Sequence, residues 1–264
     1  MDISNEFSIY NVIDIAKEAG DRILDIYNEG KDAANIKYKD DNSPLTSADL
    51  ASNNVIVSAL KKITPNIKIL SEEGRKESYN ERSSWNRLWI IDPLDGTKEF
   101  IKRNGEFTVN IGLIENSKPV LGVVYAPVID TLWFGDGNGS FKKVGSLPEN
   151  RIHVSAGITK RPVRVVVSRS HLNDKVTDFI SQFNDYKLLR VGSSIKMCLV
   201  ADGSADIYPR LGPTMEWDSA ASHAIINNAG GSMINIDNRQ DLIYNKRDLH
   251  NPWFIVNSNI KYSI

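Results

Sequence analysis

Hydrophobic residues recur at helical spacing in two N-terminal segments of the chain. Residues 7–28 carry apolar side chains three or four positions apart and are followed by Gly30, which predicts an amphipathic helix. Residues 47–63 predict a second helix, with Ser47 as its N-cap and Asp49 in its first turn. Two shorter elements are expected between these helices: a strand over residues 36–39 and a polar turn over residues 40–44.

After the second helix the pattern changes to short apolar runs separated by turn residues, which is typical of β-strands. The expected strands cover residues 67–71, 88–91, 107–114, 120–125 and 131–134. Asn116–Lys118 and Asp136–Gly139 have the composition of hairpin connections. Successive strands joined by short turns pair antiparallel, so we predict a mainly antiparallel sheet.

From about residue 148 strands and helices alternate. The expected strands are 163–167, 188–191 and 205–208, and the expected helices are 174–183, 193–201 and 218–228. The sequence therefore predicts two layered halves. Residues 1–148 form an α+β half that carries most of the candidate acids, and residues 149–264 form an α/β half.

Composition places the chain among globular proteins. Its 264 residues are 41% hydrophobic and 25% charged, enough for a substantial core in one large or two closely packed domains. The net charge of −1, with acids and bases interspersed, argues against nucleic acid as the main partner but leaves room for a small anionic ligand. No segment approaches the roughly 20 apolar residues of a membrane span, and residues 1–6 lack the features of a secretory signal.

Cysteine and histidine usage narrows the chemistry further. Cys198 is the only cysteine, so no internal disulfide is expected, and its apolar neighbours predict a core position. The four histidines lack a zinc-ligand spacing. A reducing cytoplasm is the expected location. Loose attachment to the inner face of a membrane stays open, as does the oligomeric state.

The run Trp89–Thr97 carries the strongest chemical signal. An apolar strand ends in Asp92 and Asp95, with Pro93 between them and Gly96 at the turn that follows. Two carboxylates about 4 Å apart repel by about 4 kcal/mol at an effective dielectric constant near 20, so a hard cation such as Mg²⁺ would stabilise them. The alternative is an ordinary strand-to-turn exit, because Asp, Pro and Gly are all common turn residues.

Further acids occupy similar settings. Glu72 follows the apolar run that precedes this strand, and Asp49 and Asp218 lie near helix starts, where an acid alone is usually a cap. If neighbouring strands place Glu72 beside Asp92 and Asp95, three carboxylates share one cleft, and Asp218 closes it from the second half. Such a cluster suits magnesium-assisted phosphoryl transfer, in which two ions hold the attacking and leaving oxygens.

Gly96 and Thr97 then acquire roles in the same cleft. Backbone N–H groups at a glycine turn that enters a helix can bind phosphate oxygens. The Thr97 hydroxyl, if hydrogen-bonded to a carboxylate such as Asp49, would orient a metal-bound water and help to deprotonate it.

Taken together, these motifs resemble the lithium-sensitive, Mg²⁺-dependent phosphatases of the inositol monophosphatase superfamily. The matching segments, in chain order, are Ser43–Asp49, Ser71–Gly74, Asp92–Thr97 and Trp217–Ala221. The resemblance implies an α/β/α/β/α layered fold, two or more Mg²⁺ ions and inhibition by lithium. It also implies a metal site with the carboxylates of Glu72, Asp92, Asp95 and Asp218 and the carbonyl of Leu94 as ligands. Asp49 and Thr97 would be the pair that activates water.

Within this superfamily the chain is most similar to bacterial 3'(2'),5'-bisphosphate nucleotidases. The segments that carry this similarity are Asp95–Asn110, Gly192–Lys196 and Tyr208–Thr214. The resemblance implies hydrolysis of the 3'-phosphate of adenosine 3',5'-bisphosphate to AMP and phosphate, in support of sulfur assimilation. The sister activity on inositol or sugar phosphates and a non-catalytic phosphate-binding role are the alternatives. The intact acids and Thr97 argue against the second alternative.

The expected substrate contacts surround the same acids. They are Glu72, Gly96, Thr97, Ser193, Ser194, Lys196, Arg210 and Asp218. The alternative for residues 193–196 is a helix cap with an exposed lysine. Residues 168–171 follow a buried strand and are a further candidate for the cleft wall. Met215 and Glu216 depart from the family pattern and leave the base or sugar preference open.

Overall fold

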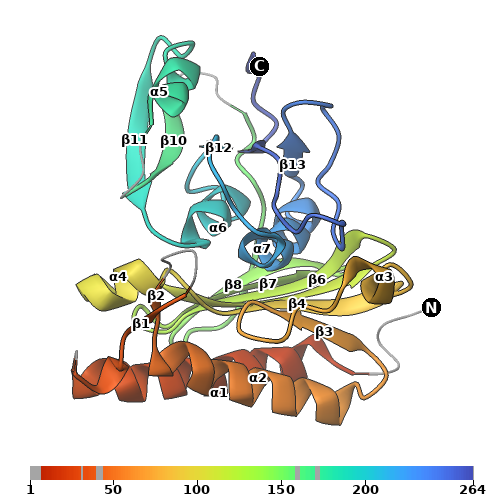
Figure 1. Cartoon of the computed structure of the whole chain (residues 1–264). Helices are drawn as coiled ribbons and strands as arrows, with labels where there is room; N and C mark the ends of the chain where they lie inside the picture. Colours follow the sequence, from red (N-terminus) through yellow and green to blue (C-terminus); the bar gives the residue numbers. More distant parts are fainter. Residues whose placement is uncertain (1–6, 31, 40–43, 158–160, 170–172, 264) are drawn as a thin grey trace.

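The computed structural model describes residues 7–30, 32–39, 44–157, 161–169 and 173–263, and it has five layers (Figure 1). Helices α1 (Ile9–Glu29) and α2 (Ser47–Ile63) cover one face of a seven-stranded sheet. Helices α6 (Ile195–Ala201) and α7 (Glu216–Asn228) lie between its other face and a five-stranded sheet. Helix α5 (Asp174–Ile180) packs on the outer face of the second sheet. The expected α/β/α/β/α layering is confirmed.

The seven-stranded sheet follows chain order from edge to edge. Its strands are β3 (Lys68–Ser71), β4 (Arg87–Asp95), β5 (Thr108–Glu115), β6 (Lys118–Ala126), β7 (Thr131–Asp136), β8 (Gly139–Val144) and β9 (Asn150–Ile152). Every neighbouring pair is antiparallel except β3 and β4, which are parallel. The connection between β3 and β4 contains α3 (Tyr79–Arg82) and is long enough to return the chain to the end of the sheet where β3 begins. The C-terminal ends of β3 and β4 therefore lie side by side at the opposite end of these strands.

The turn between β5 and β6 is the expected hairpin connection. It consists of Asn116 and Ser117, whose φ angles are +49° and +64°. Positive φ at both central positions matches the right-handed twist of the flanking strands, and Asn tolerates it well. Here local turn chemistry determines the pairing of two long strands.

The start of α2 corrects one sequence-based expectation. Thr46, rather than Ser47, is the N-cap, and its hydroxyl accepts a hydrogen bond of 3.2 Å from the Ala48 N–H. Ser47 is the first helical residue and donates its hydroxyl to the Ala33 carbonyl instead. The short strands β1 (Lys37–Tyr38) and β2 (Pro44–Leu45) pair antiparallel just before this helix. Residues 40–43 of the expected polar turn lie outside the described residues.

The five-stranded sheet mixes both pairing modes. Its order is β11 (Tyr186–Val191), β10 (Val163–Ser168), β12 (Ile207–Arg210), β14 (Phe254–Asn257) and β13 (Ser232–Asn235). The first three strands are parallel, and β14 pairs antiparallel with both of its neighbours. The first sheet extends to β9, just beyond the expected boundary near residue 148. The division into two halves stays a prediction.

A row of glycines allows α7 to lie close to the first sheet. Gly112, Gly122 and Gly135 face one another across β5, β6 and β7. A Cβ atom on Gly122 would lie only 2.0 Å from the carbonyl oxygen of Ala221 in α7. The missing side chains create the groove that brings the start of α7, and with it Asp218, toward the end of β4.

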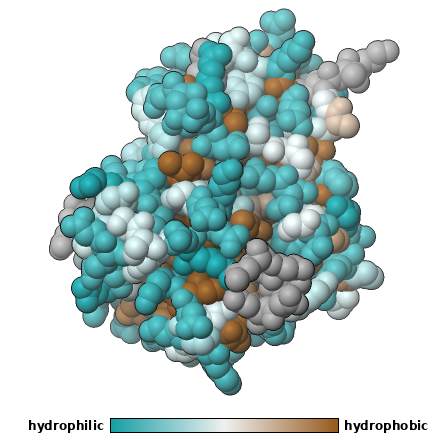
Figure 2. Space-filling view, turned by 90° about the vertical axis from the view of Figure 1, so that its right-hand side faces the viewer, coloured by the Kyte–Doolittle hydropathy of each residue, from teal (hydrophilic) through white to brown (hydrophobic). Residues whose placement is uncertain are grey.

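The remaining features agree with the composition. Cys198 is fully buried in the core, as its apolar neighbours predict. Figure 2 shows a mostly hydrophilic face on which hydrophobic residues form small patches. Among the described residues, no helix combines the length and the apolar character that crossing a membrane requires.

Candidate active site

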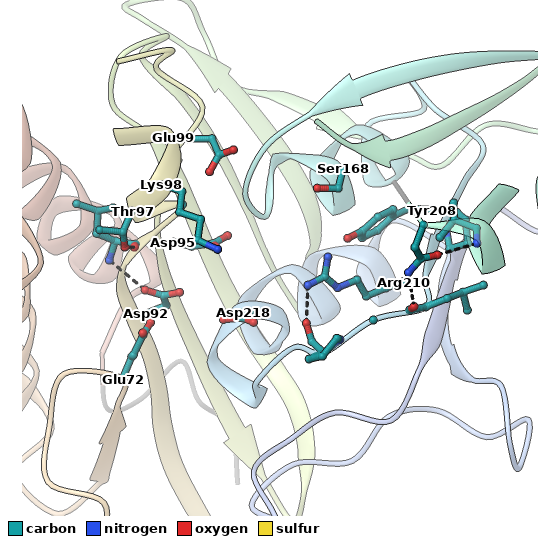
Figure 3. Close-up of a pocket in the computed structure, with 18 of the residues that line it drawn as sticks. Glu72, Asp92, Asp95, Thr97, Lys98, Glu99, Ser168, Tyr208, Arg210 and Asp218 are labelled. Carbon is teal, nitrogen blue, oxygen red and sulfur yellow. Dashed lines mark hydrogen bonds between the residues drawn. The ribbon is translucent and has the colours of Figure 1, made fainter. Parts of the chain in front are cut away.

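Three carboxylates from three separate elements meet at one edge of the first sheet. Glu72 follows β3, Asp92 belongs to β4, and Asp218 lies in the first turn of α7. One carboxylate oxygen of each lies within 4.8 Å of the others (Figure 3). The parallel pairing of β3 and β4 brings the first two together, and the close packing of α7 adds the third. Their role as metal ligands stays a prediction.

Asp95 lines the same cavity but lies outside this three-acid group. One of its oxygens accepts hydrogen bonds from the Ser193 hydroxyl at 2.7 Å and the Ser194 N–H at 2.5 Å. Leu94 also lines the cavity, and its carbonyl accepts a hydrogen bond of 3.4 Å from the Thr97 hydroxyl. The structure thus brings Asp95 and Leu94 to the rim of the acid cluster.

The crowding of buried acids changes their ionisation. Burial, followed by the charges of Glu72 and Asp95, raises the pKa of Asp92 well above its ordinary value. Burial, followed by Asp95 and Glu72, raises the pKa of Asp218 to about 8. These shifts mean that the cluster holds protons unless another positive charge balances it. A purely oxygen donor set with this excess of negative charge fits a hard divalent cation.

Asp49 and Thr97 meet, as the family resemblance implies. The Thr97 hydroxyl donates a hydrogen bond of 3.2 Å to one oxygen of Asp49. The other Asp49 oxygen accepts from the N–H and hydroxyl of Thr46 at 2.7 and 2.6 Å, because Asp49 closes the capping box of α2. Burial raises the pKa of Asp49 to about 6. The capping hydrogen bonds at the start of α2 therefore also fix the orientation of Asp49 toward Thr97.

The acids open into a cavity of about 790 Å³ that extends to the end of β12. Its walls include two cations, Lys98 from α4 (Thr97–Lys102) and Arg210 from β12, together with Tyr208 and Ser168 (Figure 3). Of these wall residues, the sequence reasoning missed Lys98 and Tyr208. Both belong to the motifs that carry the resemblance. Their positions in the sequence, directly after Thr97 and two residues before Arg210, were the signal that could have identified them as cavity residues.

Ser193, Ser194 and Lys196 lie behind the cavity rather than among the residues that line it. Both serine hydroxyls contact the Thr108 hydroxyl, at 2.6 and 2.7 Å. Lys196 is only 7% exposed and donates to the Ser193 carbonyl, so the alternative of an exposed lysine is wrong. Their contact with substrate stays a prediction. Ser170 and His171 of the further wall candidate lie outside the described residues.

Two lysines that the sequence reasoning missed lie beside Glu72. The Lys39 ammonium contacts a carboxylate oxygen of Glu72 at 2.8 Å and one of Glu73 at 2.5 Å. Lys76 contacts the backbone of the same segment. Lys39 ends the strand expected over residues 36–39 and Lys76 lies in no expected element, so no signal in the sequence placed either lysine beside Glu72.

Comparison with known proteins reveals extensive similarity. A family model described as the inositol monophosphatase family matches residues 6–262. The 3'(2'),5'-bisphosphate nucleotidase CysQ of Salmonella typhimurium is 47% identical over 219 residues, which cover 83% of this chain and 87% of the relative. The Escherichia coli protein of the same name is 45% identical, with the same coverage. The crystal structure of CysQ from Bacteroides thetaiotaomicron superposes with a TM-score of 0.83 at 43% identity, covering 94% of this chain and 96% of that one.

Proposed function

The chain belongs to the inositol monophosphatase family, and from this premise we propose that it is a metal-dependent 3'(2'),5'-bisphosphate nucleotidase. Water attacks the 3'-phosphorus of adenosine 3',5'-bisphosphate, the bond from phosphorus to the 3'-oxygen breaks, and AMP and phosphate leave. This activity supports sulfur assimilation. The observation that carries the chemistry is the convergence of Glu72, Asp92 and Asp218 within 4.8 Å. The identity of 45–47% to named nucleotidases supports the substrate.

The proposed metal is Mg²⁺, with two or more ions bound. The proposed ligands are the carboxylates of Glu72, Asp92, Asp95 and Asp218 and the carbonyl of Leu94. Bound Mg²⁺ would neutralise charge on the phosphoryl oxygens and lower the pKa of water. The mutual repulsion of these acids and the burial of Asp92 support this assignment, because a divalent cation balances the charge that otherwise requires protons.

Asp49 and Thr97 prepare the attacking water in this proposal. The Thr97 hydroxyl donates a hydrogen bond to ionised Asp49, so a lone pair of the Thr97 oxygen can accept a hydrogen bond from water. As the water attacks, its proton would pass to the Thr97 oxygen while the Thr97 hydroxyl proton passes to Asp49. Gly96 adopts a φ angle of +96°, a conformation that favours glycine. The backbone N–H groups of Gly96 and Thr97 at this turn are the proposed contacts of the phosphate.

The second phosphate of the substrate requires a cation away from the acids. Arg210 lines the far wall of the cavity and is the proposed partner, with a charge-assisted hydrogen bond to phosphate. Ser193 and Ser194, which hold Asp95, and Lys196 beside them remain proposed contacts at the rear of the cavity. The proposed location is the cytoplasm.

A substrate panel tests the proposal. We expect phosphate release from adenosine 3',5'-bisphosphate to exceed that from myo-inositol 1-phosphate by a wide margin in Mg²⁺, and to stop when a chelator is added. The reverse ranking would assign the chain to the inositol phosphatases of the family. Tight nucleotide binding without turnover would instead support a phosphate-binding protein.

A further inference from the structure

Lys76 folds back onto the segment that carries Glu72. Its ammonium group donates hydrogen bonds to the backbone carbonyl of Ser71 at 2.7 Å and that of Gly74 at 3.3 Å, and it also contacts the Glu72 carbonyl. Three carbonyls from one short segment thus surround a single ammonium group. The contacts fix the backbone on both sides of the Glu72 side chain.

The same ammonium group reaches the second half of the site. It lies 4.7 Å from the centroid of the Trp217 ring, a cation–π contact. Trp217 immediately precedes Asp218 in the first turn of α7, and it is only 6% exposed. Lys76 therefore connects the segment after β3 with the start of α7, the two elements that present Glu72 and Asp218.

We propose that Lys76 is a positioning residue that sets Glu72 and Asp218 at the separation that the metal requires. The proposal rests on the proposed metal site. Mg²⁺ demands near-octahedral oxygen ligands at about 2.0–2.1 Å, so small displacements of a ligand reduce its affinity. Lys76 contacts carbonyls and an aromatic ring, and these contacts leave the Glu72 carboxylate oxygens available. Lys39, by contrast, contacts one of those oxygens directly.

Calorimetric titration of MgCl₂ into the metal-free enzyme, without substrate, tests this role. Lys76→Met keeps the apolar stem and removes the ammonium group. We expect Mg²⁺ to bind about tenfold more weakly, the usual effect of losing a group that orients metal ligands. Arg75→Met is the matched control, because it removes the same charge from a neighbouring side chain that is 79% exposed. It should bind Mg²⁺ like the wild type.

The direction of the change in Mg²⁺ affinity distinguishes a positioning role of Lys76 from a purely electrostatic one. Removing a positive charge near the acids would by itself strengthen Mg²⁺ binding, so tighter or unchanged binding by Lys76→Met would overturn the proposal. We expect Lys76→Met to reach full turnover at saturating Mg²⁺. It should need a higher Mg²⁺ concentration than the wild type to reach half of its maximal rate. A uniform loss of turnover at every Mg²⁺ concentration would indicate a purely structural role and would count against the proposal.

Trp217→Phe gives an independent variant that preserves an aromatic ring at the start of α7. The smaller ring weakens the cation–π contact, so Mg²⁺ affinity should fall by a few-fold in this variant. The same substitution in a Lys76→Met background should add no further loss, and full additivity would overturn the proposed coupling. A wild-type enzyme that binds no Mg²⁺ would refute the metal site itself. Wild-type binding that Lys76→Met leaves unchanged would refute only the role of Lys76.

Discussion

Thr97 contacts Asp49 through one hydrogen bond of 3.2 Å, and this contact is proposed to orient water. Thr97→Val keeps the shape of the side chain and removes the hydroxyl. We expect kcat to fall by about 10²–10⁴-fold, the usual contribution of general acid–base catalysis, while Mg²⁺ affinity stays unchanged. Steady-state kinetics at saturating Mg²⁺ measures the loss. Thr131→Val removes a hydroxyl elsewhere in the protein, bonded to the Ile129 carbonyl, and should retain wild-type kcat. An equal loss in that variant would contradict the assignment.

Asp92 is the most enclosed of the acids, at 1% exposure, and it also accepts a hydrogen bond of 3.1 Å from the Leu94 N–H. Asp92→Asn preserves this acceptor but removes the charge. Activity should be nearly abolished. The metal-free variant should nevertheless unfold at a higher temperature than the metal-free wild type, because one buried carboxylate no longer faces its neighbours. Thermal unfolding with and without Mg²⁺ checks both effects, and a normal Mg²⁺-induced stabilisation of the variant would argue against a ligand role.

At the scale of elements, the position of α7 depends on the absence of a side chain at Gly122. The Cβ of Gly122→Ala would lie 2.0 Å from the Ala221 carbonyl oxygen, so the helix must move away from the sheet. We expect a loss of about 1–3 kcal/mol in unfolding free energy, typical of overpacking, and weaker Mg²⁺ binding because Asp218 moves with the helix. Denaturant unfolding and Mg²⁺ titration measure these effects. Gly137→Ala, with no atom within 4 Å of its Cβ, is the control and should change neither.

Elements with strong local signals could be predicted from the sequence, and elements that depend on tertiary contacts could not. The hairpin at Asn116 and Ser117 followed from turn residues, which act locally. The strands β13 and β14 were missed, because their short segments, residues 232–235 and 254–257, lie outside the alternating pattern and become strands by pairing with each other and with β12. Thr46 replaced Ser47 as the cap of α2 because the Ser47 hydroxyl bonds to the distant Ala33 carbonyl.

At the scale of the whole molecule, the candidate site draws on both halves of the chain. The motif residues Asp92 and Thr97 could be identified because their chemistry is concentrated in one short run. The meeting of Glu72 with Asp218 was a conditional hypothesis until the resemblance supported it, since no spacing rule links residues so far apart. Lys76 could not be found at all, because its contacts depend on how the segment after β3 packs against α7.

The raised pKa values make the stability of the metal-free enzyme depend on pH. Asp218 ionises near its ordinary value of 3.8 when unfolded but near pH 8 when folded. Between these pH values the folded state binds more protons than the unfolded state. The contribution of Asp218 to the free energy of unfolding is therefore complete below about pH 3.8 and is lost as the pH rises to about 8. Burial lowers the pKa of His223 from 6.5 to about 3. The unfolded state therefore binds more protons between these values, and the contribution of His223 to stability grows as the pH rises and is nearly complete about one pH unit above 6.5.

Above about pH 7.5 the imidazole of His223 is almost fully deprotonated in both states, because its pKa is 6.5 when unfolded and about 3 when folded. Thermal unfolding between about pH 7.5 and 8.5 therefore separates the acid cluster from His223. In EDTA, Tm should fall as the pH rises, because ionised Asp218 must coexist with Asp95 and Glu72. Bound Mg²⁺ balances that charge, so in Mg²⁺ the enzyme should melt at a higher temperature that varies little over the same range. Asp218→Asn cannot ionise and should lose most of the slope in EDTA. A slope that persists undiminished in this variant would assign it to groups other than Asp218, Asp92 among them. A Tm that rises with pH in the wild type would contradict the raised pKa of Asp218.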